Sequence, residues 1–268
     1  MKSLPFRIAF IALLFLALGG ALAPWVAPYN PDTITLSEQL SPPNSEHWFG
    51  QDRLGRDILS RWLYSARLSL SISFFVVLLS LTFGALIGMI SGYRGGWLDE
   101  ILMRMVDILL AFPGLLLAIA LTAVMGPSLF NIIFALSLLG WTSYARLART
   151  QTLSLKNRDY IQATQALGTP IRRIFLKHLL PNLAGPLLVQ ATFSLAGVIL
   201  AESSLSFLGL GPQNHPTWGG MLSEGVEYLF RAPTLSIFPG IAIMASVLSL
   251  NILGDQLRDK LDPKSKHL

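Results

Sequence analysis

The sequence predicts an all-α polytopic membrane protein with six transmembrane helices and a polar helix-turn-helix between spans four and five. Only 13% of its 268 residues are charged and 52% are hydrophobic, whereas a typical soluble domain has roughly 25% charged residues. The apolar residues gather in runs long enough to cross about 30 Å of hydrocarbon, which takes about 20 helical residues. One polar stretch, 157–182, interrupts these runs.

The first apolar run, 6–26, predicts a retained anchor helix. Ala21-Leu22-Ala23 is typical of a signal-peptide cleavage site, so cleavage is the alternative. The run is longer than the roughly 7 to 15 residues of a signal-peptide core, and Pro24 would hinder cleavage. Polar residues follow, so we expect 1–67 to hold the anchor and an extracytoplasmic loop.

Residues 68–92 carry no charge and predict span two. Within it Gly84, Gly88 and Gly92 recur every four residues on one helix face. This small-residue spacing lets two membrane helices approach closely. We therefore predict that these glycines serve helix packing.

A short charged turn is predicted at 93–104. Between Arg104 and Arg146 the single charge is Asp107, which we expect to pair with Arg104 three residues away. So long an apolar stretch must hold two spans. The Gly126-Pro127 break divides it into spans three and four.

The polar stretch 157–182 predicts two short helices joined by a tight bend. Gly168 suits a helix C-terminus because it tolerates a positive φ, and Pro170 suits the first turn of the next helix, with Thr169 as its cap. Asp159 and Gln162 resemble a capping box. Helical spacing predicts an apolar stripe of Tyr160, Ala163, Leu167, Ile171, Ile174, Phe175 and His178. Helices of about ten residues are marginal alone.

Span five is predicted at 183–200 and span six at 232–254, with a second outer loop between them. The five-span core is thus 68–257, and 258–268 forms a basic tail. Glu202 follows span five, and an acid near a span usually faces a water-filled path or the bundle interior. Two interpretations stay open. In one, Glu202 lines the translocation path; in the other, it lies at the outer boundary and is capped by Ser203, Ser204 or backbone donors.

The positive charges predict the orientation. With the N-terminus inside, fifteen of the 20 lysines and arginines fall in inner segments and five in outer loops. Positive residues favour the cytoplasmic side, so both termini and the stretch 157–182 are expected there. The net charge of +5 is explained by this bias, and nucleic-acid binding is not expected.

The residues that enzymes need are missing. There is no cysteine, which excludes disulfides and thiolate metal sites, and no GxxxxGK[ST] loop for ATP. The four histidines are scattered without an HExxH pattern, and there is no GxSxG elbow. We expect no catalytic site, no metal and no cofactor in this chain.

Five segments, which cover nearly the whole chain, resemble one family. YIQATQALG followed by RRIFLKHLLPN resembles the EAA loop of bacterial ATP-binding-cassette importer permeases. HWFGQDRLGRDILSR, AESSLSFLGLG, WGGMLSEG and NILGDQLRDKLDP are similar to the second permease subunit of the dipeptide, oligopeptide and nickel group.

The resemblance implies that the bend docks into a groove of a separate ATPase subunit. The residues expected to couple are Asp159, Tyr160, Gln162, Ala163, Ala166, Leu167, Gly168, Thr169, Pro170, Arg172 and Arg173. The family usually has Glu where this chain has Gln162, so a salt bridge through that acid is absent. The alternative is an amphipathic helix on the lipid surface, since its basic face suits anionic headgroups.

The resemblance further implies an inner-membrane subunit that works by alternating access. Its expected partners are a second homologous permease, two ATP-binding ATPase subunits, a solute-binding protein on the outer face, and membrane lipid. Peptide is the expected cargo, and nickel or another small solute the alternative. The alternative from another class is a membrane scaffold or passive channel without an ATPase.

Overall fold

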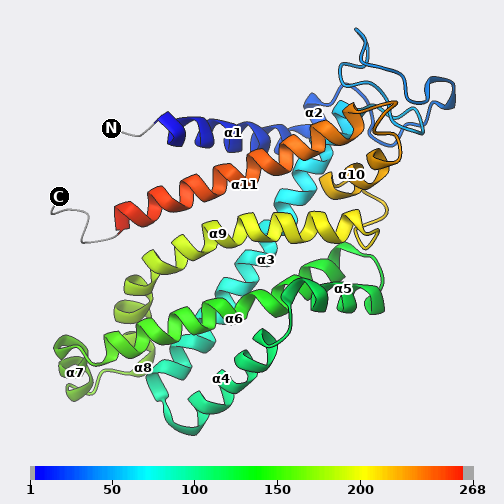
Figure 1. Cartoon of the computed structure of the whole chain (residues 1–268). Helices are drawn as coiled ribbons and strands as arrows, with labels where there is room; N and C mark the ends of the chain where they lie inside the picture. The colour runs from blue at the N-terminus through cyan, green and yellow to red at the C-terminus, as the bar shows by residue number, and fades with distance from the viewer. Residues whose placement is uncertain (1–3, 262–268) are drawn as a thin grey trace.

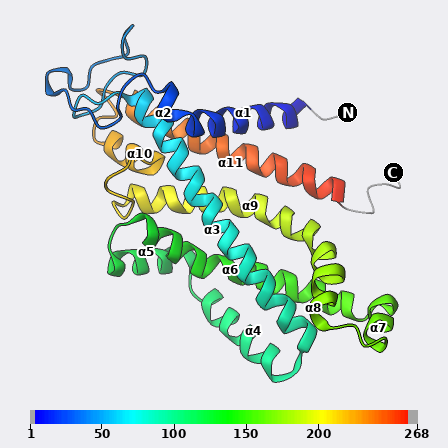
Figure 2. The ribbon, with the colours of Figure 1, turned by 180° about the vertical axis from the view of Figure 1, so that it is seen from behind.

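The computed structural model describes residues 4–261, and within this range every regular element is a helix (Figure 1). The elements are α1 (Leu4–Ala21), α2 (Ala23–Val26), η1 (Leu36–Glu38), α3 (Ile58–Arg94), α4 (Gly96–Leu110), α5 (Gly114–Met125), α6 (Leu129–Lys156), α7 (Asp159–Ala166), α8 (Ile171–Ile174), the π-helical turn η2 (Phe175–Leu179), α9 (Leu180–Phe207), α10 (Trp218–Val226) and α11 (Thr234–Leu261). The helices α1, α11, α9 and α6 lie roughly side by side, and α3 crosses behind them (Figures 1 and 2).

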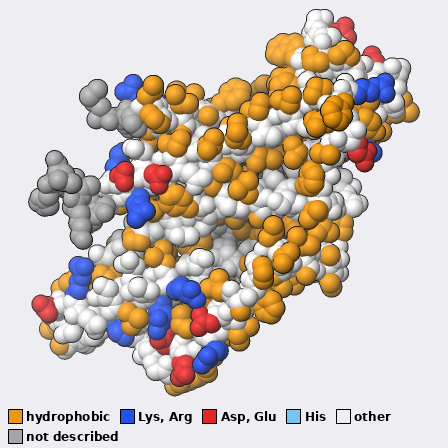
Figure 3. Space-filling model, viewed as in Figure 1, with side chains coloured by type: hydrophobic (Ala, Val, Ile, Leu, Met, Phe, Trp, Pro, Cys, Tyr) orange, Lys and Arg blue, Asp and Glu red, His pale blue; other side chains and the backbone are white. Residues whose placement is uncertain are grey.

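Four helical stretches in the described range are long and apolar enough to cross a membrane: α1, α3, the continuous stretch 171–207, and α11. A fifth is possible if α4 and α5 count as one span. Charged side chains gather at the two ends of the long helices, with a largely apolar surface between them (Figure 3). Although α6 has 28 residues, Arg146, Arg149 and Lys156 in its second half lower its hydropathy. The fold is that of an all-helical membrane protein.

Spans two and three differ from the prediction. Helix α3 begins at Ile58, not near Leu68, because the Asp57 carboxylate accepts a hydrogen bond from the Ser60 N–H (2.7 Å) and caps it early. The predicted turn at 93–104 is mostly helical, since only Gly95 separates α3 from α4. The predicted span three is bent by 84° between α4 and α5. Pro113 lies at this bend, where its ring disfavours a helical conformation of the residue before it.

The three glycines of α3 lie against the backbone of α6. A Cβ on Gly84 would approach the Trp141 carbonyl oxygen to 2.3 Å, and one on Gly88 would approach the Ala145 carbonyl oxygen to 2.3 Å. At Gly92 the nearest atom is the Arg149 carbonyl oxygen, at 2.8 Å. Any side chain would push the helices apart, so the α3–α6 contact depends on these positions.

Ion pairs join α4 to α6 near the Gly92 end of this α3–α6 contact. Asp107 pairs with Arg146 at 2.8 Å, so the prediction of Arg104 as its partner is wrong. The reason is tertiary: α4 packs beside α6, which brings a basic residue from a distant part of the sequence to the carboxylate. Asp99 likewise accepts two hydrogen bonds from Arg149, at 2.6 and 2.7 Å.

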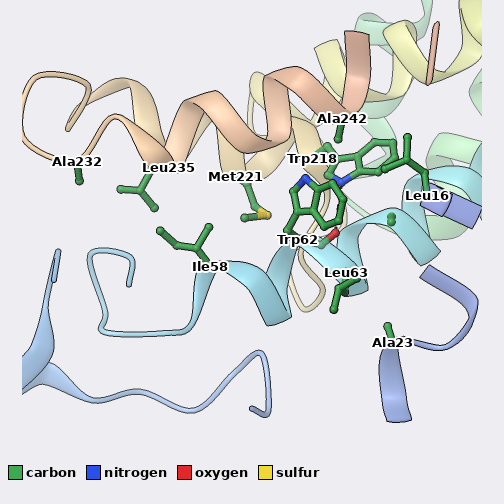
Figure 4. Close-up of a cluster of buried hydrophobic side chains, with 11 residues drawn as sticks. Leu16, Ala23, Ile58, Trp62, Leu63, Trp218, Met221, Ala232, Leu235 and Ala242 are labelled. Atoms are coloured by element: carbon green, nitrogen blue, oxygen red, sulfur yellow. Dashed lines mark hydrogen bonds between the residues drawn. The ribbon is translucent and has the colours of Figure 1, made fainter. Parts of the chain in front are cut away.

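A tryptophan-centred core holds the opposite end together (Figure 4). Trp62 of α3 donates its indole N–H to the Phe238 carbonyl (3.1 Å), and Trp218 of α10 donates to the Trp62 carbonyl (3.3 Å). Met221 and Leu235 pack in the same cluster. The start of α3 is thereby joined to α10 and α11, and the loop residues Ala27, Leu40 and Phe49 pack against this core.

Candidate functional site

The bend in 157–182 forms at Gly168, which ends the first helix as predicted. The Leu167 N–H donates to the Ala163 carbonyl (3.1 Å) and the Gly168 N–H to the Gln165 carbonyl (2.9 Å), which closes α7. Gly168 has a φ of +72° and nothing within 4 Å of the position its Cβ would take. A residue with a side chain would be strained there although space is open.

The predicted helix caps are wrong. Arg158 is the N-cap of α7, and Asp159 is its first helical residue, so there is no capping box; Gln162 instead donates to the Asn157 carbonyl at 3.5 Å. Pro170 is the N-cap of α8, and no side chain caps that helix, so Thr169 does not.

The second of the two helices predicted in 157–182 is not a separate short helix. α8 continues through η2 into α9, and the whole stretch 171–207 is one continuous helical segment. The wide turn η2 comes just before Pro181, which has no N–H for the ladder. The bend is therefore joined to α9 by one continuous helical segment.

The apolar stripe predicted for the first helix is also wrong. Ile161 is the fully buried side chain of α7 and packs with Ile174 in the cluster of Leu155 and Leu179. Tyr160 and Leu167, which the stripe included, are 42% and 85% exposed. Ile161 was missed because the position of so short a helix is set by its tertiary neighbours.

Two contacts tie the element to the ends of α3 and α6. The Gln165 amide donates to the Tyr93 hydroxyl (3.0 Å), and the Tyr93 ring packs edge-on against Phe175 at 5.2 Å. Lys156 donates to the Gly92 carbonyl (2.9 Å). Sequence periodicity did not indicate Tyr93, because it lies at the end of a different span.

The residues predicted to couple lie together on the surface. All eleven are exposed except Thr169, which is half-buried. A pocket of ≈ 610 Å³ opens beside them, between Tyr93, Lys156, Gln162 and Thr169. In Figures 1 and 2, α7 projects at the far end of the long helices. The element presents an open apolar and basic surface.

A second pocket, of ≈ 390 Å³, lies at the opposite end of the molecule, beside the loops before α3 and before α10. One wall is a charged network in which Arg56 contacts Asp52 (2.6 Å) and Glu224 (2.9 Å), and Arg61 contacts the same two acids at 3.4 and 3.3 Å. The network joins the loop before α3, which carries Arg56, to α10.

Glu202 is buried behind this pocket. Its Oε1 accepts a hydrogen bond from Ser206 (2.7 Å), not from Ser203 or Ser204, and Oε2 has no hydrogen-bond partner among the described residues. Ser206 and Thr217 line the pocket, whereas Glu202 does not. The acid thus supports the pocket wall from inside.

Replacing Glu202 tests that support. Glu202→Gln is expected to keep near-normal thermal stability, because its amide oxygen still accepts from Ser206. Glu202→Ala is expected to cost about 2 kcal/mol, because it leaves a cavity and a buried hydroxyl without its acceptor. Thermal unfolding of the purified complex measures both, and equal stability of the two variants would contradict the assignment.

Comparison with known proteins identifies the chain. Residues 84–267 match the family described as binding-protein-dependent transport system inner membrane component. The chain belongs to this family. The permease is 46% identical to the dipeptide transport system permease protein DppC of Alkalihalophilus pseudofirmus, over 86% of this chain and 76% of that protein. It is 42% identical to the glutathione transport system permease protein GsiD of Pectobacterium atrosepticum, over 97% of this chain and 88% of that protein.

A solved structure shares the permease fold. It is one of the inward-facing conformations of the MetNI methionine ABC transporter, with a TM-score of 0.61 and 19% identity, covering 75% of this chain and 96% of that chain. The permease is therefore a component of a binding-protein-dependent transport system and not an enzyme. Membership of this family implies ATPase and substrate-binding partners.

Proposed function

We propose that this permease forms half of the transmembrane path of an ATP-driven importer of dipeptides and oligopeptides, opposite a second homologous permease. The names of its relatives support the cargo, since they describe dipeptide and glutathione transport. Cargo moves by alternating access without covalent chemistry.

The exposed bend of 157–182 carries this proposal. A helix as short as α7 is marginal in water on its own, and its exposed Tyr160 and Leu167 offer apolar surface that an ATPase groove would cover. Closure of two ATPase subunits would press on the bend. The push would reach α9 along the continuous helix 171–207 and α3 through Gln165 and Tyr93.

The ATP would be bound by those ATPase subunits, and this chain would hold no cofactor. Gln162 is exposed and donates only to a backbone carbonyl, so docking at this position would rest on a neutral contact. The coupling residues would be the eleven predicted ones: Asp159, Tyr160, Gln162, Ala163, Ala166, Leu167, Gly168, Thr169, Pro170, Arg172 and Arg173.

We infer six spans, α1, α3, α4 with α5, α6, α9 and α11, in a bacterial inner membrane. Helix α1 begins and α11 ends at the end of the molecule where α7 lies (Figure 1), which supports cytoplasmic termini together with the charge bias. The anchor and outer loop would then lie in residues 1–57, because 58–67 belong to α3. Residues 68–257 would form the rest of the core and 258–268 the tail.

The solute-binding protein would meet the outer loops, where the Arg56, Arg61 and Glu224 network holds the first loop on α10. Glu202 would act through the wall of the ≈ 390 Å³ pocket beside these loops. Its buried carboxyl is separated from the pocket by Ser206.

Uptake by the reconstituted complex tests the proposal. Proteoliposomes holding both permeases and the ATPase subunits, with binding protein outside and ATP inside, should accumulate a labelled dipeptide and lose uptake without either ATP or binding protein. Accumulation of nickel in place of the peptide would favour the alternative cargo. Peptide flux that is independent of ATP would identify a passive channel and overturn the proposal.

A further inference from the structure

A long apolar groove runs along α3 on the face away from α6. Its volume is ≈ 720 Å³, and it lies between α3 and the stretch formed by α8, η2 and the start of α9. Apart from Thr82, Arg94 and Arg172, every residue lining it is apolar. Leu86 and Leu176 on its two walls are 48% and 54% exposed, so the groove is open on this chain.

The two arginines lie at one end of the groove and come from different elements. Arg94 is the last residue of α3, and Arg172 belongs to α8. Within residues 4–261, neither makes an ion pair with an acidic side chain. Arg146 and Arg149 nearby are paired with Asp107 and Asp99. The groove therefore ends in two positive charges that lack a protein counter-ion in the described range.

The dimensions fit one leaflet of a bilayer. From Leu81 to Arg94 the groove follows fourteen residues of helix, about 20 Å at 1.5 Å per residue. This spans the hydrocarbon of one leaflet, about 15 Å or half of the roughly 30 Å core, and reaches the headgroup level. Arg94 ends α3, where the chain would leave the hydrocarbon. In Figure 2, α3 crosses in front of the other long helices, with α8 beside its lower end. Acyl chains would lie along the apolar walls with the headgroup at the arginines.

We propose that this groove binds one anionic phospholipid, whose phosphate contacts Arg94 and Arg172 and whose acyl chains lie between α3 and η2. A zwitterionic lipid would fill the same walls but would bring its own positive charge to the arginines. The bound lipid would link the end of α3 to α8 at the base of the bend. The site does not depend on the identity of the cargo; it shares Arg172 with the residues proposed to couple to the ATPase, whereas Arg94 lies outside them.

Native mass spectrometry of the assembled transporter tests the site, using added phosphatidylglycerol and phosphatidylcholine with identical acyl chains. The unaltered complex should retain phosphatidylglycerol in preference. The variant R94Q/R172Q should lose roughly thirtyfold in phosphatidylglycerol retention, because each basic residue near a lipid surface contributes about 1 kcal/mol. Its phosphatidylcholine retention should not change.

Two further variants make the outcome decisive. R104Q/R158Q removes two exposed arginines outside the groove and should keep full retention. Arg94 lies outside the coupling residues, so Arg94→Gln alone should lose roughly fivefold, whatever happens to docking at the bend. Equal retention of the two lipids, or equal losses in the R94Q/R172Q and R104Q/R158Q complexes, would overturn the proposal.

The other occupant of such a groove would be a helix of the partner permease. A cysteine at Leu86 in this cysteine-free chain should react with a lipid-soluble maleimide in the assembled complex and should not crosslink to the partner. A crosslink from this position to the second permease would show that protein covers the groove and would refute lipid binding there.

Discussion

Gly88→Ala is expected to destabilise the folded permease strongly. A Cβ at this position would lie 2.3 Å from the Ala145 carbonyl oxygen and 2.8 Å from the Ala148 Cβ. Backbone atoms cannot rotate away as a side chain can, so α3 and α6 must separate and break the contacts above and below. We expect a loss of about 3 kcal/mol, at the upper end for overpacked sites. Thermal loss of the monodisperse peak on size exclusion measures it.

Gly197→Ala is the matched control for this prediction. Gly197 also lies inside a long helix, α9, but nothing lies within 4 Å of the position of its Cβ. Because alanine is the better helix former by about 1 kcal/mol, this variant should be as stable as the unaltered protein or slightly more stable. If Gly88→Ala behaved like Gly197→Ala, the close α3–α6 packing would be wrong.

Gly168→Val is expected to abolish cargo uptake while membrane insertion and assembly persist. The glycine has a φ of +72°, a conformation that a β-branched residue adopts only as an outlier. No neighbour would clash with the new side chain, so the core is untouched and the bend alone must change shape. ATP-dependent uptake in proteoliposomes should fall to background, and ATP hydrolysis should no longer respond to the binding protein.

Gly126→Val is the control that distinguishes a changed bend in 157–182 from backbone strain in any connecting turn. Gly126 has a φ of +86° and an equally open surrounding, but it joins α5 to α6 outside the coupling element. It should carry similar backbone strain and retain most of the uptake. Comparable loss of uptake in both variants would mean that strain in any connecting turn disables the transporter, and the special role of the bend would be lost.

Composition and motif order predicted the fold class and the family, because the apolar runs and the five family segments are written in local sequence. The same holds for the glycine spacing of α3 and for the positive φ of Gly168, which need only one helix or one turn to recognise. Each follows from a local physical demand on the residue.

Tertiary packing decided the features that the sequence did not predict. Asp107 meets Arg146 across two helices, and Ile161, not Tyr160, is buried because α7 is held by its neighbours. The bend between α4 and α5 lies at Pro113 inside an apolar run. Composition alone indicated a span there but not its bend. Tyr93 gains its link to Gln165 only when α3 and α7 are placed together.

Crosslinking at the bend tests the central claim most directly. Single cysteines at Gln162 and Leu167, in a chain that has no cysteine, should each form an ATPase adduct with a short thiol-to-amine crosslinker in the assembled complex. A cysteine at Trp97, 73% exposed on α4, should give no such adduct. If the cysteines at positions 162 and 167 react with maleimide but trap no ATPase subunit, the bend is not the docking site.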